Sequence, residues 1–362
     1  MSAGQRVFLA ATGQNRGKTT ASLGLTAAII GRGSKTGFIK PVGQRYLVVE
    51  GTRADEDAVL MKAVFDLPDA LDDMSPVTLP RHFTTDFIMG KIDADLGREV
   101  TDAADRVGAD KDLLVIEGTG HAGVGAVVGL SNARVAALLE APVVIVSEGG
   151  VGRPIDEIVL NHALFERAGV RVIGALVNKV DVTSHPKLPE VLERGLDQHG
   201  IELLGCIPYS DLLANPSLEL IATHLDGELL AGEATPGRTI GHVAIGAMRA
   251  GHAAELIPDR TLLITPGDRD DLIAMALELN GASRDRVTGL VLTGGFQPGV
   301  ARLRELRAAG LFTYLVKSDT YRSAQAVDEI LVKTHPTDLD KIETIIQLVG
   351  GSLDIGGFLA HL

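Results

Sequence analysis

Short apolar runs alternate with longer amphipathic stretches along the first half of the chain. The apolar runs cover residues 6–12, 36–40, 112–118, 141–149 and 170–179. Between them, residues 19–31, 57–65 and 153–168 carry apolar positions at helical spacing. Runs that are continuously apolar are typical of parallel strands buried on both faces. This βαβα order predicts an α/β fold, a parallel sheet with helices on both faces.

The pattern changes after about residue 210. Residues 215–241 end in a Gly/Thr/Pro-rich stretch, which indicates the edge of a linker. A second, smaller α/β pattern follows. Its predicted strands are 260–267, 288–295 and 311–317, and its predicted helices are 269–278, 299–308, 320–332 and 338–349. We therefore expect a first domain over residues 1–212 and a second over residues 213–362.

Composition narrows the class of protein. The 362 residues are 45% hydrophobic and 22% charged, which is ordinary globular composition. The net charge of −13 argues against general nucleic-acid binding. The single cysteine, Cys206, cannot form an internal disulfide and fits a reducing compartment. The N-terminal apolar run is too short for a signal segment, and no stretch approaches the roughly 20 apolar residues of a spanning helix. We expect a cytoplasmic protein without a membrane or nucleic-acid partner.

The most informative segment is A-T-G-Q-N-R-G-K-T-T, residues 11–20, which follows a predicted strand and opens a predicted helix. In a P-loop the backbone N–H groups hold the phosphates, Lys18 reaches the β- and γ-oxygens, and the Thr19 hydroxyl ligates Mg²⁺. Thr12 stands where the consensus has its first glycine. The alternative is a tight strand–helix turn without a nucleotide. The candidate nucleotide-binding residues here are Gly13, Gln14, Asn15, Arg16, Gly17, Lys18, Thr19 and Thr20.

Two acids and a second lysine follow the predicted strands. Glu117 lies at the end of the run 112–118, where a Walker-B-like acid would sit, and Asp57 lies at the start of a predicted helix. Mg²⁺ prefers one or two carboxylates plus phosphate and water, so Thr19, Asp57 and Glu117 are the candidate metal ligands. The alternative for Asp57 is a first-turn acid that favours the helix dipole. Lys40 ends the run 36–40, and such strand ends face the ligand crevice of open α/β sheets. Lys18 and Lys40 are the candidate catalytic residues, with a surface lysine as the alternative for Lys40.

A possible base-recognition segment, Asn178-Lys179-Val180-Asp181, follows the run 170–179. In P-loop GTPases N-K-x-D reads guanine. The alternative is that Asn178 holds adenine while Asp181 only caps the next turn. Pro208 ends the next strand at the same sheet edge, so Asn178, Lys179 and Pro208 are the candidate base contacts.

Together these residues resemble the dethiobiotin synthetase-like branch of P-loop enzymes over roughly residues 5–215, and the resemblance implies a P-loop NTPase-like parallel sheet with helices on both faces. The matching motifs are G-K-T at 17–19, K-P-V at 40–42, Asp57-Ala58, E-G-x-G at 117–120, and Asn178-Lys179 followed by I-P at 207–208. Members of this branch use ATP and Mg²⁺ to phosphorylate a carboxylate or carbamate, which an amine then displaces. The resemblance implies that Lys18 holds phosphates, that Thr19, Asp57 and Glu117 hold Mg²⁺, that Lys40 contacts the carbamate and the transferred phosphate, and that Asn178 contacts the base. The segment 121–130 departs from the family's substrate loop, which puts diaminopelargonate in doubt as a substrate.

The second half resembles the DRTGG domain. The motifs that carry this resemblance are T-P-G-D-R-D-D at 265–271, V-L-T-G-G at 291–295 and S-D-T-Y at 318–321. The domain order resembles that of the N-terminal half of long bacterial phosphate acetyltransferases and of the BioD-like phosphotransacetylase family. The acetyltransferase catalytic domain has no counterpart in these 362 residues, so we do not expect acetyl transfer. The glycine turns at Gly267, Gly294 and Gly295 either hold an anion or only make turns.

Two functions remain open on this reading. The first is a Mg-dependent NTP-binding and NTP-hydrolysing protein with a ligand-sensing DRTGG domain and a regulatory role. Its nucleotide is expected to be ATP, with GTP as the alternative. The second is an ATP-dependent ligase or cyclo-ligase that activates a small carboxylate or carbamate. Either one needs an unknown small-molecule ligand or substrate, and relatives of the first domain imply a homo-oligomer. Cys206 ends a predicted strand and does not lie in a nucleophile elbow, so we expect no glutaminase chemistry.

Overall fold

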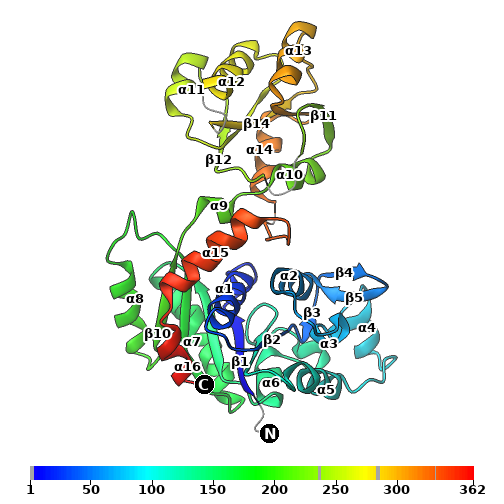
Figure 1. Cartoon of the computed structure of the whole chain (residues 1–362), viewed down its shortest axis with the longest axis vertical. Helices are drawn as coiled ribbons and strands as arrows, with labels where there is room; N and C mark the ends of the chain where they lie inside the picture. The colour runs from blue at the N-terminus through cyan, green and yellow to red at the C-terminus, as the bar shows by residue number, and fades with distance from the viewer. Residues whose placement is uncertain (1–3, 235–237, 283–285, 331) are drawn as a thin grey trace. The chain divides into compact units, whose positions relative to one another are not determined.

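The structure is a computed structural model that describes residues 4–234, 238–282, 286–330 and 332–362. The chain divides into two compact units, each with its own sheet (Figure 1). Unit 1 comprises Met1–Tyr209 together with Glu343–Leu362, and unit 2 comprises Ser210–Ile342. The predicted α/β class is confirmed in both units.

Unit 1 is built on a six-stranded sheet in which every pair of neighbours is parallel. The strands, in spatial order, are β10 (Leu203–Pro208), β9 (Val172–Val180), β8 (Val143–Glu148), β1 (Gln5–Ala11), β7 (Leu113–Glu117) and β2 (Thr36–Ile39). β1 and β7 lie inside the sheet, and their continuous apolar runs are buried as expected for strands covered on both faces. The chain passes from β7 to β8 across β1, so the strand order reverses around β1. Open α/β sheets bind ligands outside the carboxyl ends of their strands at such a reversal.

Helices flank this sheet (Figure 1). They are α1 (Lys18–Ile30), α2 (Glu56–Phe65), α3 (Leu71–Met74), α4 (Phe83–Ile88), α5 (Leu96–Gly108), α6 (Asn132–Leu138), α7 (Gly152–Arg167), α8 (Leu188–Asp197), α16 (Ile355–Ala360) and a 3₁₀ turn, η1 (Ala126–Val128). Two short two-stranded sheets complete the unit, β3 (Val42–Gly43) with β6 (Val77–Thr78) and β4 (Tyr46–Val49) with β5 (Thr52–Asp55).

The end of the chain differs from the expected second domain of residues 213–362. The division between the units falls inside α15 (Leu339–Ser352), and residues Glu343–Leu362 belong to unit 1. Val349 of α15 is fully buried, and a Cβ at Gly24 of α1 would lie 2.3 Å from the Cβ of Val349. The missing side chain at Gly24 therefore lets α15 lie directly on α1. The larger part of α15, from Glu343 onward, therefore packs within unit 1 although it follows unit 2 in the sequence.

Unit 2 contains a five-stranded sheet. Its order is β11 (Gly227–Ala231), β15 (Phe312–Val316), β14 (Val287–Thr293), β13 (Thr261–Pro266) and β12 (His242–Ile245), with β11 antiparallel and the others parallel. Its helices are α9 (Asp211–Ala214), α10 (Leu218–His224), α11 (Ala250–Leu256), α12 (Asp270–Ala282), α13 (Val300–Ala309) and α14 (Thr320–Asp328). Leu262 and Ile264 of β13 belong to one buried cluster and Leu263 to another. Because alternate residues of a strand point to opposite faces, this sheet has a core on each side.

The expected linker edge at 215–241 instead contains α10 and β11. β11 is an edge strand in which Gly227, Glu228 and Leu229 are exposed. The sequence therefore has no continuous apolar run that would predict this strand. The Thr235-Pro236-Gly237 part of that stretch lies outside the described residues, as does residue 331 in the expected helix 320–332.

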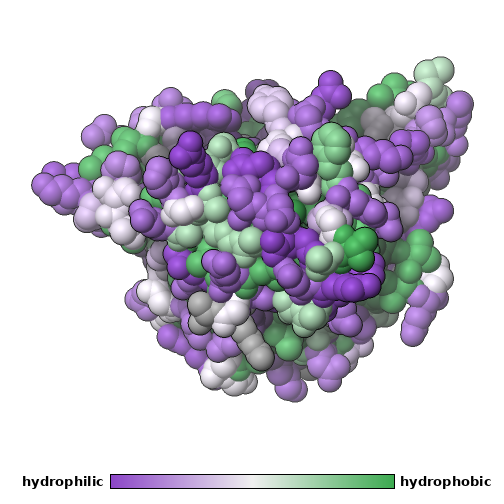
Figure 2. All heavy atoms as spheres, turned by 90° about the horizontal axis from the view of Figure 1, so that it is seen from above, coloured by the Kyte–Doolittle hydropathy of each residue, from purple (hydrophilic) through white to green (hydrophobic). Residues whose placement is uncertain are grey.

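Within the described ranges, no helix is both long and apolar enough to cross a membrane. The face drawn in Figure 2 is dominated by hydrophilic residues, with hydrophobic side chains interspersed.

Candidate functional site

The candidate phosphate loop lies at the carboxyl end of β1, the central strand of unit 1. Lys18 begins α1 directly after Gly17, which has a φ of 95° and caps the helix. A Cβ at position 17 would lie 1.8 Å from Nδ2 of Asn178, at the end of β9. The left-handed backbone and this close approach both require glycine here. The Lys18 side chain is buried, and its Nζ donates to the Gly13 carbonyl oxygen at 3.3 Å.

Two side chains from β9 hold the backbone of the loop. Asn178 Nδ2 donates to the Arg16 carbonyl oxygen at 3.4 Å, and Lys179 Nζ donates to the Asn15 carbonyl oxygen at 3.2 Å. Asn15 itself has a φ of 59°. In this structure the two expected base contacts therefore support the phosphate loop. Of the other expected nucleotide-binding residues, Gln14 is exposed and Thr20 is half-buried.

The side chain of Arg16 turns toward β8 and α7. Its guanidinium pairs with Glu148, at the end of β8, and lies 3.6 Å from Glu157 of α7. Burial raises the pKa of Glu157, but the hydrogen bond from Arg153 and the charge of Arg16 outweigh it and hold that pKa below its ordinary value. Glu157 also hydrogen-bonds with Thr12, whose hydroxyl lies 3.2 Å from the Ser147 hydroxyl. The loop's non-consensus threonine thus has polar partners of its own.

The three expected metal ligands come together. Thr19 Oγ1 lies 3.1 Å from Asp57 Oδ1 and 3.2 Å from Glu117 Oε1. Glu117 is the last residue of β7, and Asp57 lies in the first turn of α2. Asp55 is the N-cap of α2 and accepts from the Asp57 backbone N–H at 3.0 Å. Asp55 therefore caps the helix that carries Asp57.

Lys40 follows β2 and reaches the same carboxylates. Its Nζ lies 2.6 Å from Asp57 Oδ2, 2.8 Å from Glu117 Oε1 and 3.3 Å from the Gly118 carbonyl oxygen. Burial lowers the pKa of Lys40, but the carboxylates of Asp57, Glu117 and Asp55 outweigh it and raise that pKa above its ordinary value. Burial, supported by Asp57, raises the pKa of Glu117 against the opposing charge of Lys40.

These oxygen donors fit a divalent cation. Glu117 is fully buried, and its Oε2 has no hydrogen-bond partner among the residues that the structure describes. Over the same residues, no three His, Cys, Asp or Glu side chains form a metal-holding group. A cation at Thr19, Asp57 and Glu117 would therefore complete its coordination with phosphate or water oxygens, which is the usual arrangement for Mg²⁺.

The glycine-rich loop after Glu117 is held by two buried asparagines. Asn132 of α6 accepts from the Thr119 backbone N–H at 3.1 Å, and its Nδ2 donates to the carbonyl oxygens of Thr119 and His121 at 2.8 and 2.7 Å. Asn161 of α7 accepts from the Ala122 backbone N–H at 2.8 Å. The exposed His121 accepts from the Gly123 backbone N–H at 3.2 Å through Nδ1.

The remaining residues of the expected base-recognition segment lie beyond Lys179. The Asp181 carboxylate accepts from the Ser184 backbone N–H at 2.9 Å, which is the turn-capping alternative. Pro208 ends β10 and is half-buried, and Tyr209 is exposed beside it. Burial raises the pKa of the half-buried Cys206 to about 11, the opposite of the shift that activates a cysteine nucleophile.

In unit 2, the amides of the glycine turns are already committed to neighbouring loops. Gly267 donates to the Thr293 carbonyl oxygen at 3.1 Å, Gly294 to that of Ser318 at 2.8 Å, and Gly295 to that of Val316 at 2.9 Å. These bonds favour the interpretation that the glycines make turns and tie loops together.

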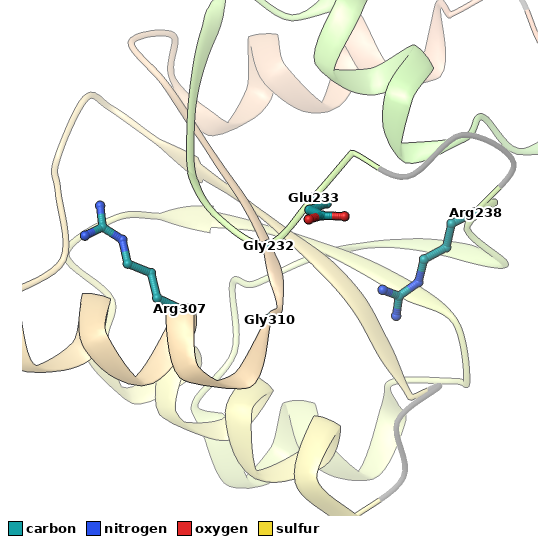
Figure 3. Close-up of a pocket in the computed structure, with 5 residues that line it drawn as sticks. All are labelled: Gly232, Glu233, Arg238, Arg307 and Gly310. Atoms are coloured by element: carbon teal, nitrogen blue, oxygen red, sulfur yellow. The ribbon is translucent and has the colours of Figure 1, made fainter.

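A hollow of about 380 Å³ in unit 2 lies at the opposite ends of the strands from these glycine turns. Its lining residues are Gly232, Glu233, Arg238, Arg307 and Gly310 (Figure 3). The Arg307 guanidinium points away from Glu233, and its Nε donates to the Leu230 carbonyl oxygen at 3.1 Å. Gly310 precedes β15, so this hollow is at the amino ends of the parallel strands, where open α/β sheets do not usually bind ligands.

Sequence reasoning missed four residues that shape the site: Glu148, Glu157, Asn132 and Asn161. Glu148 is the last residue of its strand, as Glu117 is, and this position in the sequence could have predicted a site residue. The other three lie within helices and reach the loops only through tertiary packing.

Comparison with known proteins agrees with this architecture. Residues 5–217 match the AAA domain family and residues 220–330 match the DRTGG domain family. Phosphate acetyltransferase from Pseudomonas aeruginosa is 28% identical over 369 aligned positions, which cover 96% of this chain and 50% of that protein. The corresponding protein from Pseudomonas putida is 29% identical, with 97% and 51% coverage. The chain thus spans about half the length of these curated relatives.

Among solved structures, cobyrinic acid a,c-diamide synthase from Mycobacterium smegmatis with bound ADP and magnesium is 15% identical. The match has a TM-score of 0.40 and covers 57% of this chain and 87% of that one. The P-loop and carboxylate arrangement lies within residues 5–217, and DRTGG-type residues follow it. The chain therefore belongs to the AAA domain family, with a dethiobiotin synthetase-like P-loop domain followed by a DRTGG domain.

Proposed function

We propose that unit 1 binds ATP with Mg²⁺ and hydrolyses it, and that unit 2 senses a small ligand, so that the protein acts as a regulator. The observation that carries this proposal is the meeting of the phosphate loop with Thr19, Asp57 and Glu117 at one sheet edge. In such chemistry the protein mainly positions the reactants and neutralises charge on the phosphates.

Each residue has a definite part in the proposed reaction. The loop N–H groups and Lys18 would bind the phosphates, and Thr19, Asp57 and Glu117 would hold Mg²⁺, which supplies charge neutralisation when bound. A water oxygen bonds to the γ-phosphorus and loses a proton to the solvent, and the bond from that phosphorus to the bridging oxygen breaks. ADP leaves with the electron pair. Lys40 is placed to neutralise charge on the transferred phosphate.

We expect adenine as the base, and the turn-capping bond from the Ser184 N–H to the Asp181 carboxylate supports this choice over guanine. Isothermal titration calorimetry with ATP and GTP in Mg²⁺ tests the choice. Wild type should bind ATP more tightly than GTP, and the Lys18→Ala variant should bind neither. Retained ATP affinity in correctly folded Lys18→Ala would refute the phosphate-loop assignment.

The second candidate function is an ATP-dependent ligase, and buried Lys40 favours it because the resemblance to dethiobiotin synthetase-like enzymes implies that a lysine at this position contacts the substrate as well as the transferred phosphate. Hydrolysis assays with a panel of amino-carboxylates separate the two functions. Strong stimulation by one compound, lost in Lys40→Ala, would establish the ligase. Equal turnover with every compound supports the regulatory NTPase. The expected homo-oligomer stays a prediction, which sedimentation velocity with and without ATP can test, and so does the cytoplasmic location.

A further inference from the structure

One ammonium group occupies the point where the candidate metal ligands meet. Lys40 Nζ lies within 2.8 Å of an oxygen on each of Asp57 and Glu117, and its side chain is only 5% exposed. In the proposed function, Mg²⁺ binds these same two carboxylates. A lysine and a divalent cation therefore compete for the same two groups.

Lys40 and the proposed cation would compete for individual oxygen atoms. Glu117 Oε1 serves both Lys40 Nζ, at 2.8 Å, and Thr19 Oγ1, at 3.2 Å. The remaining oxygen, Oε2, is buried without a hydrogen-bond partner among the described residues. A divalent cation that binds Thr19, Asp57 and Glu117 would lie close to the ammonium, and two positive charges at such a separation repel strongly in a buried site. The two cations should not share the carboxylates.

The side chain can leave while the backbone stays. Lys40 follows β2, and its backbone N–H donates to the Met74 carbonyl oxygen at 2.8 Å, which fixes the main chain. Its four-carbon stem is flexible and can carry the ammonium several ångströms from one anion to another. The nearest anion that the proposed function supplies is the terminal phosphate of the nucleotide or a carboxylate substrate.

We propose that Lys40 is a resident counter-cation that the divalent metal displaces, so that metal binding releases the Lys40 ammonium from Asp57 and Glu117 toward the phosphate or substrate. This proposal rests on the proposed Mg²⁺ and nucleotide site. It predicts that the nucleotide-free protein binds divalent cations weakly and that the metal enters with the nucleotide. Lys40 thus neutralises the buried carboxylates before the metal enters and is delivered to the reacting groups afterwards.

The first experiment measures Mn²⁺ binding to the full chain without nucleotide by electron paramagnetic resonance. Lys40→Met and Lys40→Gln remove the ammonium and should bind Mn²⁺ at least about tenfold more tightly than wild type, because the competing charge is gone. Lys40→Arg keeps the charge and should resemble wild type. Lys111→Met is the matched control, since it removes a lysine that pairs with Asp69 at 3.0 Å, away from the proposed metal ligands. Glu117→Gln added to Lys40→Met should abolish the gain.

A second measurement uses wild type alone and is decisive even where a variant does not fold. Acetylation of Lys40 by acetic anhydride, followed by mass spectrometry, should rise when Mn²⁺ is added to the ADP-bound protein. Equal Mn²⁺ affinity in wild type and Lys40→Met, or unchanged acetylation, would overturn the exchange and leave a permanent structural ion pair. ADP binding in the presence of Mg²⁺ is measured in parallel. Its absence would refute the proposed nucleotide site, while the nucleotide-free Mn²⁺ comparison still decides the role of Lys40.

Discussion

Replacement of Asn132 by alanine should destabilise unit 1 and loosen the loop that follows Glu117. The Asn132 side chain is only 4% exposed and makes three hydrogen bonds to the backbone of Thr119 and His121. At about 1 kcal/mol net per hydrogen bond, Asn132→Ala should cost about 3 kcal/mol. For a unit of this size, that corresponds to a fall in Tm of about 6–12 °C.

Differential scanning calorimetry of the full chain measures the fall in Tm, and hydrogen exchange at the Thr119 amide locates it. Arg134→Ala is the control, because Arg134 is exposed on the same helix and should change stability by less than about 0.5 kcal/mol. Asn132→Asp should be at least as harmful as Asn132→Ala, since a carboxylate cannot donate to two carbonyl oxygens. A Tm within about 2 °C of wild type, with unchanged Thr119 protection, would show that these hydrogen bonds do not hold the loop.

Three further predictions follow from other contacts. Gly17→Ala should weaken ADP binding about tenfold or more in calorimetry, because alanine is strained in the left-handed region and its Cβ would meet Asn178. Unchanged affinity would contradict the loop geometry. Glu157→Gln should cost about 1 kcal/mol in urea unfolding at pH 7. Because the folded pKa of Glu157 is depressed, this advantage of wild type should vanish as the pH falls below about 4.5, and a gap that is constant with pH would refute it. Burial lowers the pKa of Lys341 to about 8, so wild type should gain up to about 3 kcal/mol relative to Lys341→Met as the pH rises from 8 to 10.5; a flat difference would refute the shift.

Sequence patterns predicted the parts of the fold whose physical cause is local. The run at 112–118 is a buried parallel strand because it is apolar throughout, and Gly17-Lys18-Thr19 opens a helix because the left-handed turn needs glycine. Strand ends that share one sheet edge brought Lys40 and Glu117 together, as the parallel topology requires.

The parts that the sequence did not reveal depend on distant packing. The expected base contacts of Asn178 and Lys179 stay a prediction, and the sequence did not reveal that both side chains also donate to carbonyl groups of the phosphate loop. The role of Glu157 depends on how α7 packs, which no local pattern specifies. The assignment of α15 to unit 1 depends on the contact between Gly24 and Val349, which lie more than 300 residues apart in the chain.

The split of unit 1 around unit 2 sets an order of events during synthesis. α15 carries Val349 onto Gly24 of α1, and Leu353 pairs with Gly205 beside β10. The ribosome must make residues 210–342 before that helix emerges, which takes about 7–27 s at ordinary elongation rates. During this interval the surface of α1 that α15 later covers is exposed, and at its end unit 2 has its complete sequence while unit 1 still lacks residues 343–362. Nascent chains arrested before residue 343 should therefore be the species that chaperones bind.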